Sequence, residues 1–461
     1  MNNQFKPRKL TRRDFIKLGG GGALATLATG SYLFKTGRQS LAAPAPPPAP
    51  AVLAARPNAL TTQLRLAATD GYISLPGRRI FPAPGNLSGA DPYTDIPEDQ
   101  NGLYVFGFVE AEITDTIADV IDKHKGKVQG PAPIIGINSG DDLYITVTNL
   151  GLVGRPDLDD SHTIHWHGFR NPHAVFDGVP EVSIAVPPAR DFPYFFRPRV
   201  AGTYMYHCHF EDSEHVQMGM DGIVFIRPAG APNLAYANGT TAFDREYTLL
   251  FNEVDTTPHD NLINVQEFVW SNYDPNYWVI NSRSYPDTIL TEADILGTEL
   301  ELRQPISSLI QANPGEEILL RLANLGYEQQ AMQMLGLNLT VIGHDSTFLG
   351  PLVYTTHTIY IGPGEARDVL FTAPAYSSSL PGGTDSNGPY NVYWFKNHHP
   401  QRLVNGTQDN DNLADSNATV EDVDGNPAPV GGQITQVRVY QNSLPEQTRP
   451  NETFGRTRPP F

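Results

Sequence analysis

The sequence predicts an all-β protein with two antiparallel β-sandwich domains in its 461 residues. Three observations support this fold class. Short segments rich in β-branched and aromatic residues alternate in polarity, turns rich in Pro, Gly, Asn and Asp separate them, and no long helical period lies between them. Hydrophobic residues make up 40% of the chain, which is enough for packed cores, and the length allows two or three domains.

The expected strands begin after residue 100 and follow one another at short intervals. Each combines period-two alternation with β-branched or aromatic residues, as expected for strands with one face in a core. The segments with this pattern are LYITVTNL (143–150), EVSIAV (181–186), FPYFF (192–196), GIVFI (222–226) and YTLLF (247–251). Their spacing favours antiparallel sandwiches.

A weak internal similarity indicates two copies of one domain. GPAPIIGINSGDDLYITVTNLG (130–151) and SLIQANPGEEILLRLANLG (308–326) share the order turn, strand and Asn-Leu-Gly. We place the boundary near 232–245, where the pattern breaks. The predicted parts are a signal peptide (1–42), a Pro/Ala-rich linker and lead-in (43–94), a first domain (95–235), and a second domain with a C-terminal tail (236–461).

The N-terminus resembles a bacterial export signal. Residues 11–17 read TRRDFIK, with paired Arg12 and Arg13, and a Gly/Ala-rich apolar run follows before small residues near Ala42 and Ala43. These features predict a twin-arginine (Tat) signal peptide that is cleaved, so we expect a periplasmic or otherwise exported protein. A membrane anchor is the alternative, but the apolar run is short and glycine-rich for a spanning helix.

The charge balance excludes some partners. The formal net charge is −18, and without the first 40 residues, which hold eight Lys or Arg and one acid, it becomes −25. Such a surface repels nucleic acid and anionic lipid, so we expect neither as a partner and no stable membrane insertion after cleavage. Cations or a basic redox partner are compatible with it. The single cysteine, Cys208, excludes an intrachain disulfide.

Cys208 lies in a run of metal-binding residue types, GTYMYHCHFEDSEHVQMGMDG. Cys208, His215 and Met220, with one upstream histidine, provide a thiolate, two imidazoles and a thioether. This donor set is typical of the blue, type 1 copper electron-transfer site. His162 is the natural upstream member, because its odd offset from His165 lets it face away from the other histidines. Zinc is the competing metal, but a methionine at this position favours copper.

The remaining histidines of the two clusters form a second predicted site. In an extended segment residues two apart face the same side, so His165 and His167 point together, as do His207 and His209, while Cys208 faces away. An imidazole patch without thiolate suits copper or zinc that binds a small molecule rather than passing electrons. The sequence therefore predicts two metal sites joined through the HCH tripeptide.

The motifs HTIHWHGF and GTYMYHCHFEDSEHVQMGM, with GPAPIIGINSGDDLYITVTNLG before them, resemble the cupredoxin domain of a multicopper oxidase. NPGEEILLRLANLG, LTVIGHDSTFLGP and IGPGEARDVLFTAP resemble the copper-free cupredoxin-like domains of that family, so the resemblance covers residues 95–445. It implies two cupredoxin-like Greek-key sandwiches, as in a two-domain laccase-like protein, with copper as cofactor. The implied type 1 ligands are His162, Cys208, His215 and Met220. The implied ligands of a type 2/type 3 trinuclear centre are His165, His167, His207 and His209.

One departure from the family pattern concerns the spacing of the ligands. The family usually places the type 1 histidine five residues after the cysteine, whereas His215 follows Cys208 by seven. We expect the extra residues to bulge outward and to reshape the rim where a reductant docks. Glu211, Asp212 and Glu214 would make that rim acidic; a solvated loop is the alternative.

A second departure is the number of histidines. An intact trinuclear centre of the family needs eight, and the first domain supplies four. The second domain contains no His-x-His pair; its histidines are His259, His344, His357, His398 and His399. Three outcomes stay open: first domains of two chains join their histidines in a homo-oligomer, the patch holds one type 2-like copper completed by another subunit, or the patch is a remnant.

These inferences predict an exported copper oxidoreductase. A small-molecule or metal-ion reductant is expected to give single electrons to the type 1 copper. The catalytic residues expected to reduce oxygen are His165, His167, His207 and His209. The alternatives are a copper nitrite reductase-like enzyme and a non-catalytic copper-binding or electron-transfer protein. Asp177 in FDGVP is a candidate proton-transfer carboxylate, although a turn role in its Asp-Gly pair also fits.

Overall fold

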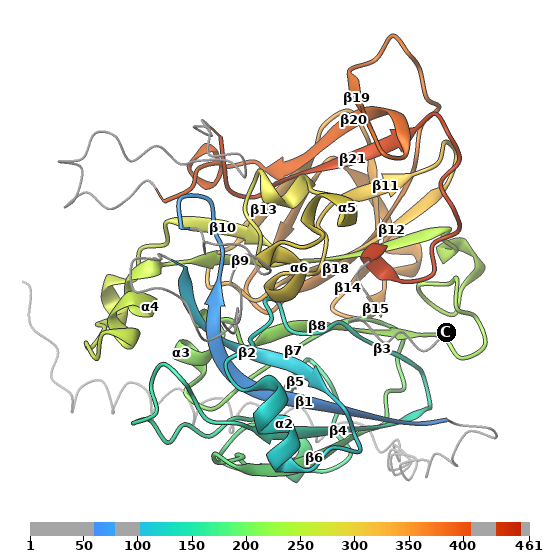
Figure 1. Ribbon diagram of the computed structural model, residues 1–461. Helices are drawn as coiled ribbons and strands as arrows, with labels where there is room; N and C mark the ends of the chain where they lie inside the picture. Colours follow the sequence, from blue (N-terminus) through green and yellow to red (C-terminus); the bar gives the residue numbers. More distant parts are fainter. Residues whose placement is uncertain (1–59, 79–101, 407–429, 453–461) are drawn as a thin grey trace, which may run out of the picture. The chain divides into compact units, whose positions relative to one another are not determined.

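A computed structural model describes residues 60–78, 102–406 and 430–452, which all belong to one compact unit spanning Ala55–Phe461. The predicted signal peptide, most of the predicted linker and the end of the tail lie outside the described residues. The described part consists mainly of strands in four sheets, which confirms the all-β fold class (Figure 1). No helix within these ranges is long and apolar enough to cross a membrane.

The first sandwich is built from two four-stranded sheets, ordered β2-β1-β4-β6 and β3-β8-β7-β5. Their strands are β1 (Thr61–Ile73), β2 (Leu103–Ala111), β3 (Ile135–Asn138), β4 (Asp142–Asn149), β5 (His165–His167), β6 (Arg190–Phe196), β7 (Gly202–His207) and β8 (Asp221–Arg227). Side chains from both sheets meet in one core, for example Leu66 of β1, Val147 of β4 and Tyr206 of β7. Burial of these facing surfaces is the main stabilising contribution.

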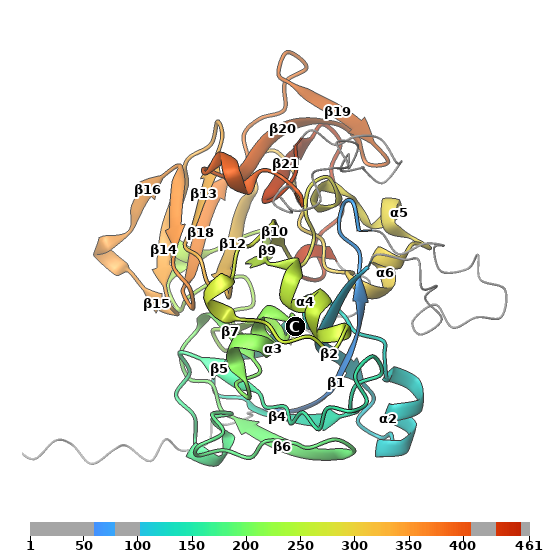
Figure 2. The same ribbon diagram turned by 90° about the vertical axis from the view of Figure 1, so that its left-hand side faces the viewer.

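The second sandwich combines a seven-stranded sheet, ordered β10-β9-β12-β18-β14-β15 with β16 beside β14, and a six-stranded sheet, ordered β11-β21-β20-β13-β17 with β19 beside β20 (Figure 2). Phe251, Leu320 and Phe395 are among its own core residues. Its strands are β9 (Arg245–Val254), β10 (Tyr277–Ile280), β11 (Ile310–Ala312), β12 (Glu317–Asn324), β13 (Gln330–Met334), β14 (Leu339–His344), β15 (Thr347–Phe348), β16 (Tyr354–Thr356), β17 (Thr358–Ile361), β18 (Ala366–Thr372), β19 (Gly382–Asp385), β20 (Gly388–Asn397) and β21 (Ile434–Tyr440).

Short helices connect the strands. The α-helices are α2 (Ile117–His124), α3 (Asp212–Gln217), α4 (Thr256–Ile263), α5 (Glu292–Ile295) and α6 (Glu299–Arg303). The 3-10 helices are η1 (Ala174–Phe176), η2 (Gly239–Thr241), η3 (Trp270–Asn272), η4 (Asp287–Ile289), η5 (Gly350–Leu352), η6 (Pro400–Arg402) and η7 (Pro450–Glu452). α2 begins with a capping box between Thr116 and Asp119, whereas α3 begins without a side-chain cap.

The internal similarity of the sequence has a counterpart in the strand pairing. β4 pairs in parallel with β1 and antiparallel with β6, and β12 pairs in the same way with β9 and β18. β3 pairs in parallel with β8, as β11 does with β21. Asn149 and Asn324 also make matching bonds, because each side-chain oxygen accepts from the backbone N–H two residues on. The two sandwiches therefore share one topology.

The range predicted as linker and lead-in (43–94) contains a strand, so that prediction is wrong for Thr61–Ile73. β1 lies between β2 and β4 and is buried over most of its length. Because both of its faces are covered, its sequence lacks the alternation of a half-buried strand. Its buried polar residues have partners: Asp70, for example, accepts hydrogen bonds from Tyr104 Oη and from the backbone of Val153 and Gly154.

The segment EVSIAV (181–186) is not a strand. It forms turns and ends in an isolated bridge between Val186 and His162. Proline residues lie on both sides of the segment, and they limit the ladder hydrogen bonds that a strand needs. The other strands expected in this part of the sequence correspond to β4, β6, β8 and β9.

Buried polar contacts join the two sandwiches at β7 and β8. Asp368 of β18 accepts a hydrogen bond from Thr203 of β7 at 2.5 Å. Asn252 of β9 donates to Asp221 of β8 at 2.6 Å. Because buried polar groups are costly without partners, these bonds hold β7, which ends at the HCH motif, and the neighbouring β8 against the second sandwich.

The placement of β1 can be tested by truncating its core side chain. Leu66 is 1% exposed, whereas Leu60, just before the strand, is 61% exposed. We expect Leu66→Ala to lower the free energy of unfolding by about 2–5 kcal/mol, because it leaves a cavity in the core. Leu60→Ala is the matched control and should change it little. Urea unfolding of both variants measures the difference, and equal midpoints would contradict the placement of β1 in the core.

Candidate metal centre

Strand pairing brings the two histidine motifs together. β5 pairs antiparallel with β7, with His165 opposite His207. β7 ends at His207, but the Cys208 N–H still bonds to the Met220 carbonyl at 3.0 Å, so Cys208 and Met220 stay neighbours at the adjoining end of β8. The HCH tripeptide is thereby fixed between β5 and the start of β8.

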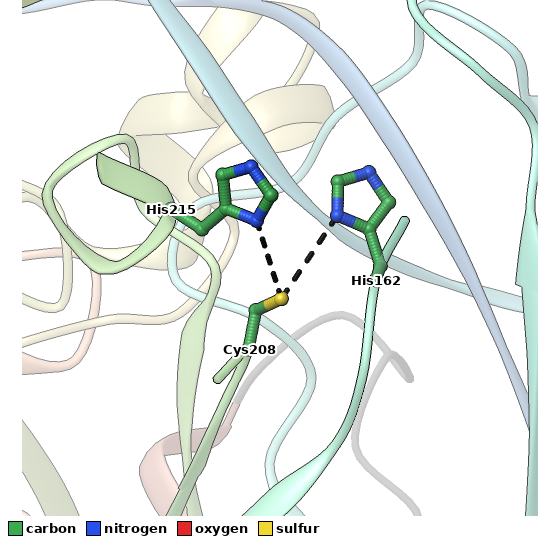
Figure 3. Close-up of side chains that lie close together, drawn as sticks. All are labelled: His162, Cys208 and His215. Carbon is green, nitrogen blue, oxygen red and sulfur yellow. Dashed lines mark hydrogen bonds between the residues drawn. The ribbon is translucent and has the colours of Figure 1, made fainter. Parts of the chain in front are cut away.

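Cys208, His162 and His215 form the first ligand group (Figure 3). Nδ1 of His215 lies 3.3 Å from Cys208 Sγ, and Nδ1 of His162 lies 3.9 Å from the same sulfur. All three side chains are fully buried. Figure 3 shows both rings turned with Nδ1 toward the sulfur. One sulfur and two nitrogen donors therefore converge on one point in the core of the first sandwich.

Thr163 connects Cys208 to the residue that follows it. The Thr163 N–H points at Cys208 Sγ at 3.4 Å, and the Thr163 hydroxyl accepts a hydrogen bond from the His209 N–H at 2.9 Å. A backbone N–H directed at sulfur stabilises the thiolate form, which is the form that binds metal. Sequence reasoning did not identify Thr163, because a threonine between two histidines carries no metal-binding signal of its own.

The protonation of the first group favours a thiolate. Burial alone would raise the pKa of the Cys208 thiol, but His215 and His162 beside it lower that pKa well below its ordinary value. Burial would likewise lower the pKa of His215, yet Cys208 and Asp160 raise it to about 10. Without bound metal, the positive charge beside the Cys208 sulfur is therefore carried by the protonated imidazole of His215.

Met220 is also fully buried in the core of the first sandwich. Its N–H bonds to the His215 carbonyl at 3.0 Å, and its carbonyl accepts from Cys208. The backbone thus joins Met220 to two members of the first group. This placement is compatible with the predicted fourth, thioether ligand.

The four other predicted ligands form a cluster of rings. Ligand nitrogens of His165, His167 and His207 all lie within 4.8 Å of one another. The ring of His209 lies 5.2 Å from that of His165 and stacks on that of His207 at 5.6 Å, measured between centroids. His207 is buried and the other three are half-buried. We refer to these four residues as the histidine patch.

Backbone carbonyls fix two tautomers in the histidine patch. Nδ1 of His165 bonds to the Asp177 carbonyl at 2.7 Å, and Nδ1 of His207 bonds to the Cys208 carbonyl at 2.8 Å. A carbonyl only accepts, so each Nδ1 carries the proton and each Nε2 keeps a free lone pair. Metal-binding imidazoles are usually oriented in this way.

Burial favours the neutral form of three histidines of the patch, His165, His167 and His207. Burial lowers the pKa of His165 and His167, and it lowers the pKa of His207 to about 3. Neutral imidazole is the form that binds metal, so no proton has to leave these residues at neutral pH. The first ligand group differs, since metal there must displace the proton on His215.

The second sandwich covers part of the histidine patch without adding a ligand. A side-chain carbon at Gly364 would lie 2.7 Å from His167 Nε2, so only glycine fits against this ring. His259 is engaged elsewhere, because Nδ1 bonds to the Tyr104 carbonyl at 2.6 Å. Within the described ranges, the metal-binding groups formed by His, Cys, Asp and Glu contain no histidine of the second sandwich.

Asp177 holds His165 mainly through its backbone. Besides the carbonyl bond, its carboxylate lies 3.7 Å from His165 Nδ1 and accepts from Asn171 at 2.5 Å. Gly178 follows with φ of +85°, and a side-chain carbon there would lie 2.2 Å from the Ile164 carbonyl oxygen. The Asp-Gly turn therefore packs directly against the strand that carries the HWH motif.

The residues between Cys208 and His215 form a helical turn rather than the expected outward bulge. Glu211 adopts a left-handed conformation with φ of 48°, and α3 begins at the next residue. Glu211 and Asp212 are exposed, as expected for an acidic rim, but Glu214 is half-buried. A helix places Glu214 beside His215 instead of leaving it in solvent.

The donor chemistry of both groups fits copper. In the first group two imidazole Nδ1 atoms face a thiolate in a buried site, and Nε2 of His162 and of His215 has no hydrogen-bond partner in the described part of the chain. Thiolate with two imidazoles suits a copper electron-transfer site, and neutral imidazoles suit copper that binds a small molecule. Bound copper would supply a one-electron redox couple in each group.

Known proteins resemble this chain in sequence and in fold. Two family models described as multicopper oxidase match residues 125–231 and 269–396. Laccase-5 of Arabidopsis thaliana is 30% identical over 247 residues, which cover 52% of this chain and 38% of that protein. The chain thus spans well under half of this relative's length.

Two solved structures from Nitrosomonas europaea share the fold. A blue copper oxidase matches with a TM-score of 0.55 and 22% identity, covering 82% of this chain and 86% of that one. A copper nitrite reductase matches with a TM-score of 0.51 and 16% identity, covering 85% and 98%. The similarity extends over most of each chain, so it includes both sandwiches.

Two glycines test how the Asp-Gly turn supports the histidine patch. Gly178 and Gly168 both have positive φ, but only Gly178 has backbone atoms in the space of a side chain. We expect Gly178→Ala to lower the copper content of the patch and the thermal stability. Gly168→Ala should cost only the strain of a left-handed alanine, about 1–2 kcal/mol. Metal analysis and thermal unfolding measure both effects, and equal losses would contradict a supporting role of the turn.

Proposed function

Because this chain belongs to the multicopper oxidase family, we propose that it is a copper-dependent oxidoreductase that takes single electrons from a reductant and reduces oxygen. The first ligand group, with Met220, would hold a type 1 copper that receives the electron. The histidine patch would hold the copper at which oxygen is reduced. A small-molecule or metal-ion reductant is the other substrate.

The observation that carries this proposal is the covalent link between the two ligand groups. Cys208 belongs to the first group, and its sequence neighbour His207 belongs to the histidine patch. The hydrogen bond from His207 Nδ1 to the Cys208 carbonyl, at 2.8 Å, adds a second connection. An electron that reaches the Cys208 sulfur is therefore one residue away from a member of the histidine patch in both directions, His207 before it and His209 after it.

Oxygen reduction also consumes one proton for each electron. Asp177 is the described carboxylate that lies next to His165, at 3.7 Å from Nδ1. Its carbonyl holds the ring, and its carboxylate would pass protons to the edge of the histidine patch. This role supports the proposal without being required by it.

The number of ligands in one chain favours completion by another subunit. A trinuclear centre of this family needs more histidines than the four in the patch, and the described second-sandwich histidines join no ligand group with it. A homo-oligomer in which a second copy adds ligands would supply the difference. The proposal therefore includes one partner, another copy of this chain.

A mononuclear copper site is the second candidate. The ligand nitrogens of His165, His167 and His207 converge within 4.8 Å, and three imidazoles are sufficient for one copper. Such a site would suit a nitrite reductase-like enzyme. Without a working patch, the first group alone would make a copper-binding or electron-transfer protein.

Export belongs to the same proposal. The twin-arginine motif with Arg12 and Arg13 lies outside the described residues, and it supports a periplasmic location after cleavage. A metal site that is buried in the folded core is compatible with a route that carries folded proteins.

The first ligand group is tested by replacing its sulfur. We expect the copper-loaded protein to show the strong blue absorption of thiolate-to-copper charge transfer, and Cys208→Ser to lose it. The histidine patch should still bind copper in this variant, because none of its four ligands is changed. Absorption spectra and metal analysis of both proteins provide the comparison. A Cys208→Ser protein that stays blue would rule out the assignment.

The histidine patch is tested by a variant that should have the opposite effect to Cys208→Ser. We expect His207→Gln to keep the blue absorption but to lose most oxygen consumption. His357→Gln, which changes an exposed histidine of β16–β17, is the matched control and should keep both.

Copper content and assembly, measured on size-separated protein, distinguish the candidates. More than two coppers per chain with oxygen consumption supports the oxidase, two support the mononuclear enzyme, and one supports electron transfer alone. Oxygen consumption that survives in His207→Gln would contradict the role of the patch.

A further inference from the structure

A row of aromatic rings leads from the first ligand group toward the surface of the first sandwich. Phe106 lies against two histidine rings of that group, with its centroid 5.6 Å from that of His215 and 6.4 Å from that of His162. The ring of Tyr104 follows at 5.8 Å from Phe106, and the ring of Tyr72 lies 5.4 Å from Tyr104. We refer to Phe106, Tyr104 and Tyr72 as the aromatic chain.

Strand geometry builds the aromatic chain. Tyr72 of β1 and Tyr104 of β2 are directly opposite each other in an antiparallel pair, so their side chains lie on one face of the sheet. Phe106 comes two residues after Tyr104 and therefore shares that face. The Phe106 N–H bonds to the Met218 carbonyl at 2.9 Å, at the end of α3, and this bond fixes Phe106 beside the helix that carries His215.

Burial decreases along the aromatic chain. Phe106 is 0% exposed and Tyr104 is 1% exposed, whereas Tyr72 is half-buried at the edge of the core. Phe106 and Tyr104 are thus closed to any reductant in solution, and Tyr72 is the member that solvent can reach. The chain therefore spans the depth between the buried ligand group and the surface.

Tyr104 has a proton acceptor in the core. Its hydroxyl donates to Asp70 Oδ2 at 2.7 Å, and Asp70 is itself fully buried. The backbone N–H groups of Val153 and Gly154 hold this carboxylate against the phenol. Burial and the charge of Asp70 raise the pKa of Tyr104 far above its ordinary value, so the phenol stays protonated. A phenylalanine would fill the same space without burying a hydroxyl, so packing alone does not require the phenol.

We propose that Tyr104 and Tyr72 form an electron relay that supplies the first ligand group when the reductant runs short. The inference rests on the proposed function, since it needs copper at Cys208 and oxygen as the final electron acceptor. A tyrosine side chain can lose one electron reversibly when its proton has an acceptor, and Asp70 is that acceptor for Tyr104. Phe106 is the bridge between Tyr104 and the histidine rings.

Each step of the relay moves one electron and one proton. The electron of Tyr104 passes across Phe106 to the oxidised copper of the first ligand group, and the phenol proton moves to Asp70. The O–H bond of Tyr104 breaks, an O–H bond forms on the carboxylate, and a neutral phenoxyl radical is left. Tyr72 then returns an electron to Tyr104, Asp70 returns the proton, and the phenol proton of Tyr72 goes to water. A reductant in solution restores Tyr72 with one electron, and water restores its proton.

Such a relay protects the two ligand groups. Oxygen reduction that starts with too few electrons stops before water is formed, and the oxidising equivalent then attacks nearby side chains. Cys208 and His207 lie closest to that reaction in the proposed function. An electron from Tyr104 completes the reduction and moves the oxidising equivalent to Tyr72, where a reductant can reach it.

Electron paramagnetic resonance of the copper-loaded full-length chain tests the relay directly. The protein is reduced with fewer electron equivalents than it has copper, mixed with oxygen and frozen. We expect the narrow signal of a tyrosyl radical in the wild type and its loss in Tyr104→Phe. Tyr247→Phe is the matched control, because Tyr247 is also 1% exposed, lies in the core of the second sandwich, and donates its hydroxyl to the Gln311 carbonyl. The blue absorption of each variant shows whether the first ligand group is intact.

A second measurement follows the decay of this radical after hydroquinone is added. We expect slower decay in Tyr72→Phe than in the wild type, because the oxidising equivalent then stays at the buried Tyr104. The inference would be overturned by a blue, oxygen-consuming protein without a tyrosyl radical, by equal radical signals in Tyr104→Phe and Tyr247→Phe, or by equal decay in Tyr72→Phe and the wild type. A protein that never turns blue with copper, or consumes no oxygen, would instead overturn the proposed function and the relay with it.

Discussion

Alternation of side-chain direction through residues 207–209 is the constraint on which both ligand groups depend. Cys208 turns its sulfur into the core of the first sandwich, toward His162 and His215, while His207 and His209 turn toward His165. The backbone bond from Cys208 to Met220 holds this segment against β8 beyond the end of β7. Two chemically different sites can therefore lie one residue apart and share a rigid connection.

The second sandwich repeats the topology of the first and serves as its support. Tyr327 donates to the Ser213 carbonyl at 2.5 Å, and Tyr273 donates to Gln217 Oε1 at 2.8 Å, so both ends of α3 are bound from this side. Gly364 covers His167. The second sandwich, whose described histidines join no ligand group, thus fixes the helix that carries His215 and closes one edge of the histidine patch.

Sequence reasoning predicted what depends on local pattern and missed what depends on distant contacts. Alternation identified β4, β6, β8 and β9, and spacing identified the histidine motifs that the structure brings together. β1 was not predicted because burial on both faces removes the alternation of polar and apolar residues that identifies a strand. The position of Asp160 beside His215 was not predicted because the two residues are 55 positions apart in the sequence. Only the fold brings Asp160 Oδ2 to 3.8 Å from His215 Nε2. The helical conformation of residues 211–217 was not predicted because the composition of this segment does not indicate the left-handed backbone of Glu211.

Histidine side chains that lie a short distance apart are in different protonation states. In the histidine patch burial dominates, and the pKa of His207 falls to about 3. At His215 burial acts in the same direction, but Cys208 and Asp160 outweigh it and raise the pKa to about 10. The difference comes from charge, not from depth. Copper that bound His165, His167 and His207 would therefore not compete with protons, whereas copper bound at Cys208 would replace a proton whose positive charge the site already accommodates.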